Sequence, residues 1–166
     1  LFYHHNAYSP HFDKNRSAQI EKLYFNPDGT IQEVKPTKRG VGPVKAGQKI
    51  HIDRYSSIEG ASVEYLDTTD YFKGWKTVFK IEGDKVCFNE VDFGKKAPKT
   101  VVLKVKSGTE AVVDVAVGKT YTSVPVPESQ DWTEVVFDMP QVKGMQDIAV
   151  SLHWGTDVEI DWITFK

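Results

Sequence analysis

Apolar and polar residues alternate along most of the chain from residue 49 onward, with the period of two that indicates half-buried β-strands. The alternating segments are 49–53, 77–81, 84–88, 101–106, 111–117, 132–137, 148–152 and 158–165. Turn-forming residues separate these segments at 82–84, 107–108, 118–119, 143–144 and 155–157. None of the segments has the period expected of an amphipathic helix. Many short strands at even spacing predict an all-β fold, either a β-sandwich or a barrel.

The beginning of the chain has a different pattern. Leu1–His5 is strand-like, and Pro27-Asp28-Gly29 is a turn sequence between apolar residues, which predicts a hairpin. Residues 35–47 are rich in proline, glycine and lysine and predict a linker. We therefore divide the chain into residues 1–44 and 45–166. One hairpin and one strand cannot bury a core alone, so the first part is expected to pack on the sandwich or on a domain absent from this chain.

The composition excludes several classes of function. The 166 residues are 40% hydrophobic, which supports a folded core. The 21 basic and 23 acidic residues nearly balance, which argues against a nucleic-acid partner. No apolar run reaches the ~18 residues of a membrane helix, so we expect no membrane partner. The single cysteine, Cys87, excludes an internal disulfide and a thiolate metal site. Because the chain starts at Leu1, without a methionine or a signal peptide, we expect that it begins within a longer protein.

Several segments of the second part occur in an order that is typical of one family. The segments are Ile50–Tyr55, Phe79–Val86, Val91–Gly94, Pro125–Trp132 and Glu159–Phe165. Together they resemble carbohydrate-binding module family 6, which commonly follows plant-cell-wall hydrolases. The resemblance implies a β-sandwich of the jelly-roll type.

The first part resembles the C-terminal end of a glycoside hydrolase family 43 enzyme, of the arabinofuranosidase or β-xylosidase type. The similar segments are Leu1–His5, Asn15–Ile20 and Leu23–Ile31. This resemblance implies a terminal strand and hairpin of a β-propeller whose remainder would be a missing N-terminal partner. The whole enzyme would hydrolyse xylan, arabinoxylan side chains or xylo-oligosaccharides, and would be secreted or periplasmic.

The resemblance to the hydrolase places no catalytic carboxylate in this chain. Glycoside hydrolysis needs two positioned carboxyl groups, and in the resembled family they come from blades N-terminal to anything present here. The acids of the first part lie in no matching motif; they are Asp13, Glu21, Asp28 and Glu33. His4, His5 and Arg16 correspond to positions near the hydrolase pocket of a whole enzyme, although a histidine packed on a strand is an equally simple interpretation of His4 or His5.

The resemblance to the module implies a sugar site with aromatic platforms and planar polar side chains, which suit the apolar faces and hydroxyl rims of sugars. Phe79 corresponds to the usual tyrosine of this site, Trp132 to its loop tryptophan and Glu159 to its amide. Both rings have the alternative of packing into the edge of the sandwich. Trp75, in an aromatic-rich loop, lines a second site on the concave sheet face or covers the core. Trp154 alternates with apolar strand residues, which predicts a place in the core, as for Trp162.

Calcium is a further implication of the resemblance, as a structural ion between the first and last strands. Calcium requires about six to eight oxygen ligands. The family's acidic positions fall on Asp53 and Asp161, whereas His51 replaces a third acid and Glu64 or Glu59 is expected to compensate for it. The alternative is that Asp53 and Asp161 are surface residues at strand ends.

Three functions follow from these interpretations. The first is a carbohydrate-binding β-sandwich that holds a hydrolase near a plant-cell-wall polysaccharide or oligosaccharide, such as xylan or arabinoxylan. The second is a structural β-sandwich that braces the propeller and binds no sugar. The third, an enzyme that uses acid pairs on the sandwich itself, would show turnover of a nitrophenyl glycoside, which we do not expect.

Overall fold

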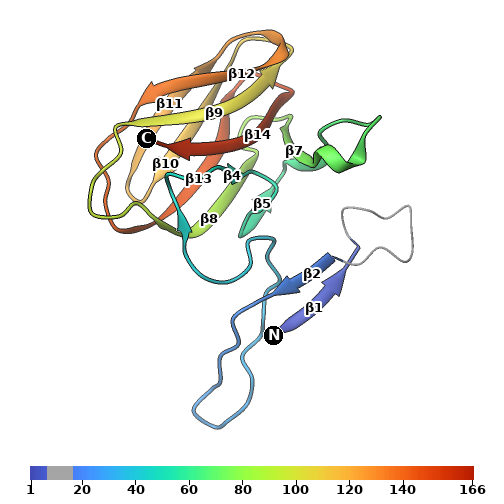
Figure 1. The fold of residues 1–166 in the computed structure, drawn as a ribbon, viewed down its shortest axis with the longest axis vertical. Helices are drawn as coiled ribbons and strands as arrows, with labels where there is room; N and C mark the ends of the chain where they lie inside the picture. Colours follow the sequence, from blue (N-terminus) through green and yellow to red (C-terminus); the bar gives the residue numbers. More distant parts are fainter. Residues whose placement is uncertain (7–16) are drawn as a thin grey trace.

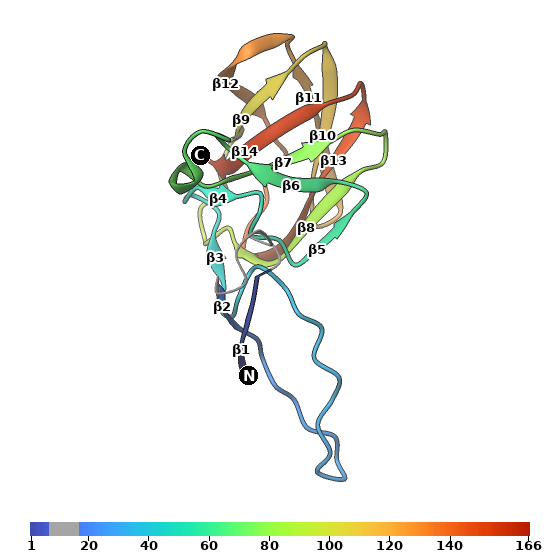
Figure 2. The same cartoon turned by 90° about the vertical axis from the view of Figure 1, so that its right-hand side faces the viewer.

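A computed structural model describes residues 1–6 and 17–166 of the chain, so the predictions for Asp13 and Arg16 lie outside the described residues. The chain forms a β-sandwich and a smaller N-terminal part below it (Figure 1). Turning the molecule separates the two layers, with β8, β13 and β10 on one side and β14, β9 and β12 on the other (Figure 2). In the described part of the chain, no helix is long and apolar enough to cross a membrane.

Each layer of the sandwich is a six-stranded sheet. The first sheet has the order β11-β10-β13-β8-β3, with β5 also paired to β8. Its strands are β11 (Thr120–Val126), β10 (Ala111–Val117), β13 (Met145–Trp154), β8 (Lys85–Asp92), β3 (Val44–Lys45) and β5 (Ser57–Glu59). The second sheet has the order β12-β9-β14-β7-β6, with β4 also paired to β14. Its strands are β12 (Ser129–Asp138), β9 (Thr100–Ser107), β14 (Val158–Phe165), β7 (Trp75–Phe79), β6 (Ser62–Tyr65) and β4 (Ile50–His51).

The core lies between the two sheets and is built from alternate residues of their strands. On β9, Leu103 and Val105 are fully buried, whereas Lys104 between them is only half-buried and points away from the core. On β10, Val113 and Val115 are buried in the same way. This alternation confirms the prediction of an all-β sandwich, because a period of two places every second side chain on one face of a sheet.

Two details of the sandwich differ from the predictions. The segment predicted as 77–81 ends at Phe79, because the carboxylate of Asp84 accepts the backbone N–H groups of Lys80 and Ile81 at 2.7 and 3.1 Å. The segment predicted as a linker ends in β3, which pairs parallel to β8, and Ala46 lies in the core with 3% of its surface exposed. The apolar residues at the end of the linker therefore belong to the sandwich.

The N-terminal part contains a two-stranded antiparallel sheet of β1 (Phe2–His5) and β2 (Ser17–Ile20). The predicted hairpin follows it: Phe25 and Ile31 form a bridge, and Asp28 Oδ1 accepts the N–H of Thr30 at 2.9 Å and its hydroxyl at 2.6 Å. Hydrogen bonds from Thr30 lower the pKa of Asp28. The carboxylate of Asp28 therefore has the turn-forming role that the Pro27-Asp28-Gly29 sequence predicts.

Candidate functional site

The outer face of the second sheet brings together two of the predicted sugar-binding residues. We define the outer face by Trp132 on β12, Lys104 and Lys106 on β9, Glu159 on β14 and Lys76 on β7. The Trp132 side chain is half-buried, and Lys104 Nζ lies 5.9 Å from the centroid of its ring. Trp132 and Glu159 are thus on the same face, with β9 between their strands.

Glu159 is held between two lysines of neighbouring strands. Its carboxylate is 2.8 Å from Lys76 Nζ and 4.0 Å from Lys106 Nζ. The register places Glu159 opposite Lys106 on one side and opposite Val78 on the other. The side chains of Glu159 and Lys76 are 21% and 14% exposed, so the pair is largely shielded from water. Such an arrangement offers a fixed hydrogen-bond acceptor and ammonium donors on the same face of the sheet as Trp132.

Phe79 does not belong to this surface, and this corrects its prediction as a sugar contact. Its side chain is 0% exposed and lies in the hydrophobic core. It is two residues from the buried Thr77 on β7, so both side chains are on the inner side of the strand. A ring with no exposed face cannot stack on a sugar, and the interpretation that Phe79 packs into the sandwich is the one that the structure supports.

The side chains predicted for calcium do not assemble into one site. Asp53 and Asp161 are buried, and His51 lies beside them, with Nδ1 3.3 Å from Asp161 Oδ1. Arg54 Nε is 3.1 Å from Asp53 Oδ2, and Lys104 Nζ is 3.7 Å from Asp161 Oδ2. Cationic side chains therefore already face both carboxylates.

Glu64 lies away from this pair of carboxylates. It is on β6 opposite Lys76, and its carboxylate is 3.8 Å from Lys80 Nζ. In residues 1–6 and 17–166, no group of three or more histidine, cysteine or acidic side chains is arranged to hold a metal. Since calcium requires about six to eight oxygen ligands, the described side chains do not fit the ion as they lie, and calcium stays a prediction from the resemblance.

Charges and burial shift the pKa values of two of these groups. The hydrogen bond with Asp161 raises the pKa of His51, and the carboxylates of Asp161 and Asp53 act in the same direction. Burial raises the pKa of Asp53, against the attraction of Arg54 and His51. A protonated imidazole beside Asp161 is thus favoured by its surroundings.

Trp75 lies at a second location, where the sandwich meets the N-terminal part. Its ring stacks on Tyr65, with 4.2 Å between centroids, and Tyr65 contacts Tyr71 at 4.4 Å. The Trp75 side chain is on the same side of β7 as Thr77 and Phe79. It lies at the start of the strand, where Trp75 pairs with Tyr65 of β6. Trp75 therefore belongs to a cavity at this junction and not to the outer face.

The two remaining tryptophans differ from one another. Trp162, predicted in the core, is buried at 3% exposure, but it pairs with Lys104 outside the main core cluster, and Lys49 Nζ lies 4.3 Å from the centroid of its ring. Trp154 was expected in the core, but 53% of its surface is exposed. Its position on β13 has the inward parity of Val150 and Leu152, yet the pairing with β10 shifts by one residue after Leu152, so that Trp154 lies opposite the outward-facing Val112. An aromatic residue next to a turn glycine, Gly155, is the signal that would have identified it.

The histidines predicted near a hydrolase pocket are on β1. His4 is exposed, whereas His5 is half-buried and both of its ring nitrogens face Lys38 Nζ, at 2.7 and 3.2 Å. Burial and the charge of Lys38 lower the pKa of His5. The neutral ring is therefore favoured, and its partner is a residue of this chain. Arg16 lies outside the described residues.

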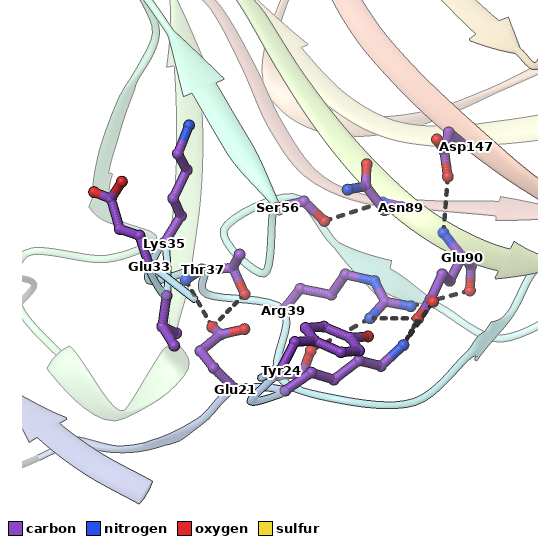
Figure 3. Close-up of a pocket in the computed structure, with 13 residues that line it drawn as sticks. Glu21, Tyr24, Glu33, Lys35, Thr37, Arg39, Ser56, Asn89, Glu90 and Asp147 are labelled. Carbon is purple, nitrogen blue, oxygen red and sulfur yellow. Dashed lines mark hydrogen bonds and ion pairs between the residues drawn. The ribbon is translucent and has the colours of Figure 1, made fainter. Parts of the chain in front are cut away.

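Ion pairs and hydrogen bonds attach the N-terminal part to β8 (Figure 3). Lys22 Nζ is 2.6 and 2.7 Å from the two carboxylate oxygens of Glu90, and Arg39 Nη2 donates to the Glu90 carbonyl at 3.0 Å. The Arg39 side chain is only 6% exposed. Glu90 itself has a φ of 56°, and its N–H donates to Asp147 Oδ1 at 2.9 Å. These contacts surround a polar cavity of about 430 Å³ and fix the direction in which the N-terminal part leaves the sandwich.

Comparisons with solved structures agree with this architecture. The chain is similar to a family 6 module from Clostridium stercorarium in complex with cellobiose, with a TM-score of 0.65 and 19% identity over 75% of this chain and 97% of that chain. It is similar to a family 6 module from Clostridium cellulolyticum in complex with xylose, with a TM-score of 0.65 and 21% identity over 74% of this chain and 98% of that chain.

A longer structure aligns with more of the chain. It is a glycoside hydrolase family 43 arabinoxylan arabinofuranohydrolase from Bacillus subtilis in complex with cellotetraose, with a TM-score of 0.68 and 19% identity. The similarity covers 91% of this chain and 34% of that one, so this chain spans about a third of the enzyme's length. A comparison with curated proteins gives no match. The model of the family "Carbohydrate binding module (family 6)" matches residues 53–166, and the chain therefore belongs to carbohydrate-binding module family 6.

Proposed function

We propose that the outer face binds neutral polysaccharide of the plant cell wall, xylan or arabinoxylan, through the ring of Trp132 and the polar side chains beside it. The observation that carries the proposal is the position of this half-buried ring on the same face as the Lys76–Glu159–Lys106 group. A ring offers an apolar surface to the C–H face of a sugar, and fixed charged groups form strong hydrogen bonds with hydroxyls. The complexes of similar modules with cellobiose and xylose support a sugar as the ligand.

We also propose that the module is attached to a family 43 hydrolase, whose products would come from arabinoxylan or xylo-oligosaccharides. Similarity to the Bacillus subtilis enzyme supports this, because it covers 91% of the chain, compared with 75% for the module from Clostridium stercorarium. A tethered module raises the local concentration of substrate even when each site is weak. We expect dissociation constants between roughly micromolar and millimolar, or about 4–8 kcal/mol of binding free energy. Such a protein would act outside the cytoplasm, secreted or in a periplasm.

Isothermal titration calorimetry with xylotetraose and xylohexaose tests the outer face. We expect Trp132→Ala to weaken binding about tenfold, as the loss of one stacked ring would. Trp154→Ala is the matched control, because it removes an exposed ring of the same type from the first sheet. Equal binding by wild type and Trp132→Ala would contradict the proposed site.

A structural brace is the second candidate function, and the Lys22–Glu90 contact is the observation that favours it. In that case the wild-type chain binds none of the oligosaccharides, and Glu90→Gln lowers the unfolding temperature. Binding of xylotetraose by the wild-type chain would reject the brace as the sole function.

A further inference from the structure

A cavity of about 590 Å³ lies between the N-terminal part and the sandwich, with an aromatic wall and a polar wall. The sandwich supplies the aromatic wall, from Tyr71, Phe72 and Trp75. The N-terminal part supplies much of the polar wall, including His5 and Gln19. In Figure 1, the β1–β2 sheet lies below β7 and the short helical turn that precedes it. The cavity therefore exists only where both parts of the chain meet.

The aromatic wall is held in place and is exposed. Tyr65 contacts both Trp75 and Tyr71, so three rings support one another. The short 3₁₀ turn η1 (Tyr71–Lys73) is capped by Asp70, whose carboxylate accepts the N–H of Phe72 at 3.1 Å. Phe72 is fully exposed at 101%, and Tyr71 is 61% exposed. Exposed rings gathered at one place mark an interaction site in a soluble domain.

The loop that carries these rings has its own bracing. Asp67 Oδ1 accepts the N–H and the hydroxyl of Thr69 at 2.8 and 2.6 Å, and its other oxygen is 2.7 Å from Lys73 Nζ. Leu66 N–H donates to the Gly74 carbonyl at 2.9 Å and closes the loop. A ligand would meet rings that are already positioned, so less conformational entropy is lost on binding.

The polar wall favours a neutral ligand. Lys38 Nζ is committed to the ring of His5 at 2.7 Å, and Arg54 is paired with Asp53 at 3.1 Å. Burial and the charge of Lys38 lower the pKa of His5, which favours a neutral imidazole that accepts from Lys38. The amide of Gln19 adds a planar group that both donates and accepts hydrogen bonds.

We propose that this junction cavity is a second carbohydrate site, which binds a neutral β-linked oligosaccharide and requires both the N-terminal part and the module. Stacked rings opposite planar polar groups are the composition that sugars require, and the volume falls within the range of about 300–1,000 Å³ that is usual for small-molecule sites. The inference rests on the proposed function for the class of ligand but on different residues. It assigns Trp75 to a site that would place a sugar chain against the N-terminal part.

Indole N–H signals of the four tryptophans separate this site from the outer face. The ¹⁵N-labelled chain is titrated with xylotetraose, cellotetraose and laminaritetraose, and each signal is assigned by a single tryptophan variant. We expect at least one sugar to shift the Trp75 signal in a saturable way in the Trp132→Ala protein. Phe72→Ala should then weaken this binding roughly three- to tenfold, the loss expected for one ring. Gln19→Ala should weaken it too, whereas Tyr121→Ala, which removes a remote exposed ring on β11, should not.

The outcomes distinguish the two proposals. A shift of the Trp132 signal without any shift of the Trp75 signal, at up to 10 mM of each sugar, would overturn the junction site and leave the outer face standing. A shift of the Trp75 signal alone would support the junction site and reject the outer face. Equal weakening by Phe72→Ala and Tyr121→Ala would overturn the junction site, because it would show that the effect does not depend on the cavity.

Discussion

Replacing Phe79 by alanine separates a core role of this ring from a sugar-binding role. The side chain is 0% exposed and lies within the main hydrophobic cluster. Removing a fully buried phenylalanine ring costs about 3–5 kcal/mol, from the lost burial and from the cavity that remains. Domains of this size have stabilities of about 5–15 kcal/mol, so we expect Phe79→Ala to fold but to be markedly less stable. Trp132→Ala should instead weaken sugar binding about tenfold and change the free energy of unfolding by less than about 1 kcal/mol.

Urea unfolding followed by tryptophan fluorescence measures the first quantity, and calorimetry with xylotetraose measures the second. Phe79→Leu is the matched variant, since it keeps much of the buried volume and should lose roughly 1–2 kcal/mol. We expect both Phe79 variants to bind xylotetraose within about twofold of the wild-type affinity, since a factor of two is below 0.5 kcal/mol. If Phe79→Leu abolishes binding while stability is unchanged, the ring contacts sugar and its placement in the core is wrong.

Three further predictions concern stability. The pKa of His51 is raised, so its contact with Asp161 stabilises the fold fully below the ordinary histidine pKa of about 6.5. This stabilisation is lost as the pH rises through the higher pKa of the folded state. The unfolding temperature of wild type should therefore exceed that of His51→Gln by more at pH 5.5 than at pH 8.5, and an equal difference at the two pH values would refute the prediction. Gly155 has a φ of 102°, and a Cβ there would lie 2.7 Å from the Cβ of Ala111. Gly155→Ala should therefore lower the free energy of unfolding in urea by about 1–3 kcal/mol. Gly108→Ala is the control, because open space surrounds Gly108, and it should change this free energy by less than about 0.5 kcal/mol. The cationic side chains that face Asp53 and Asp161 predict that EDTA and calcium chloride leave the unfolding temperature unchanged, whereas a rise of several degrees with calcium would support the ion that the resemblance implies.

The sandwich was predictable from the sequence because each long strand has one face in the core. Buried and half-buried residues alternate strictly along Ala111–Val117 of β10, and on β9 the half-buried Lys104 and Lys106 alternate with buried residues after Leu103. The short strands were not predicted: β5 and β6 contain three and four residues, too few for a period to be visible. Their place is determined by pairing with β8 and β7, which only the folded chain shows.

The candidate site was predictable only in part. Trp132 and Glu159 were identified from the resemblance, but Glu159 owes its environment to Lys76, which is distant in sequence and becomes its neighbour through the register of β7 and β14. Phe79 was assigned because it corresponds to the tyrosine of the resembled family's sugar site, although its parity with Thr77 places it on the inner side of β7. Trp154 shows the opposite limit, since the register shift between β10 and β13 after Leu152 reverses the side on which the next residues lie, and such a shift is not visible in the sequence.

The geometry around Glu159 indicates how the outer face would admit a neutral ligand. The Lys76–Glu159 contact is short, at 2.8 Å, and both side chains are largely shielded, so breaking it would leave a poorly hydrated charge. Lys106, at 4.0 Å from the same carboxylate and 33% exposed, is at the limit of an ion pair. A sugar hydroxyl can accept from Lys106 and donate to Glu159 without disturbing Lys76. In the proposed site, the short Lys76–Glu159 pair would therefore hold the acceptor in place, and a sugar would replace the weak Lys106–Glu159 contact by two hydrogen bonds on the same face as Trp132.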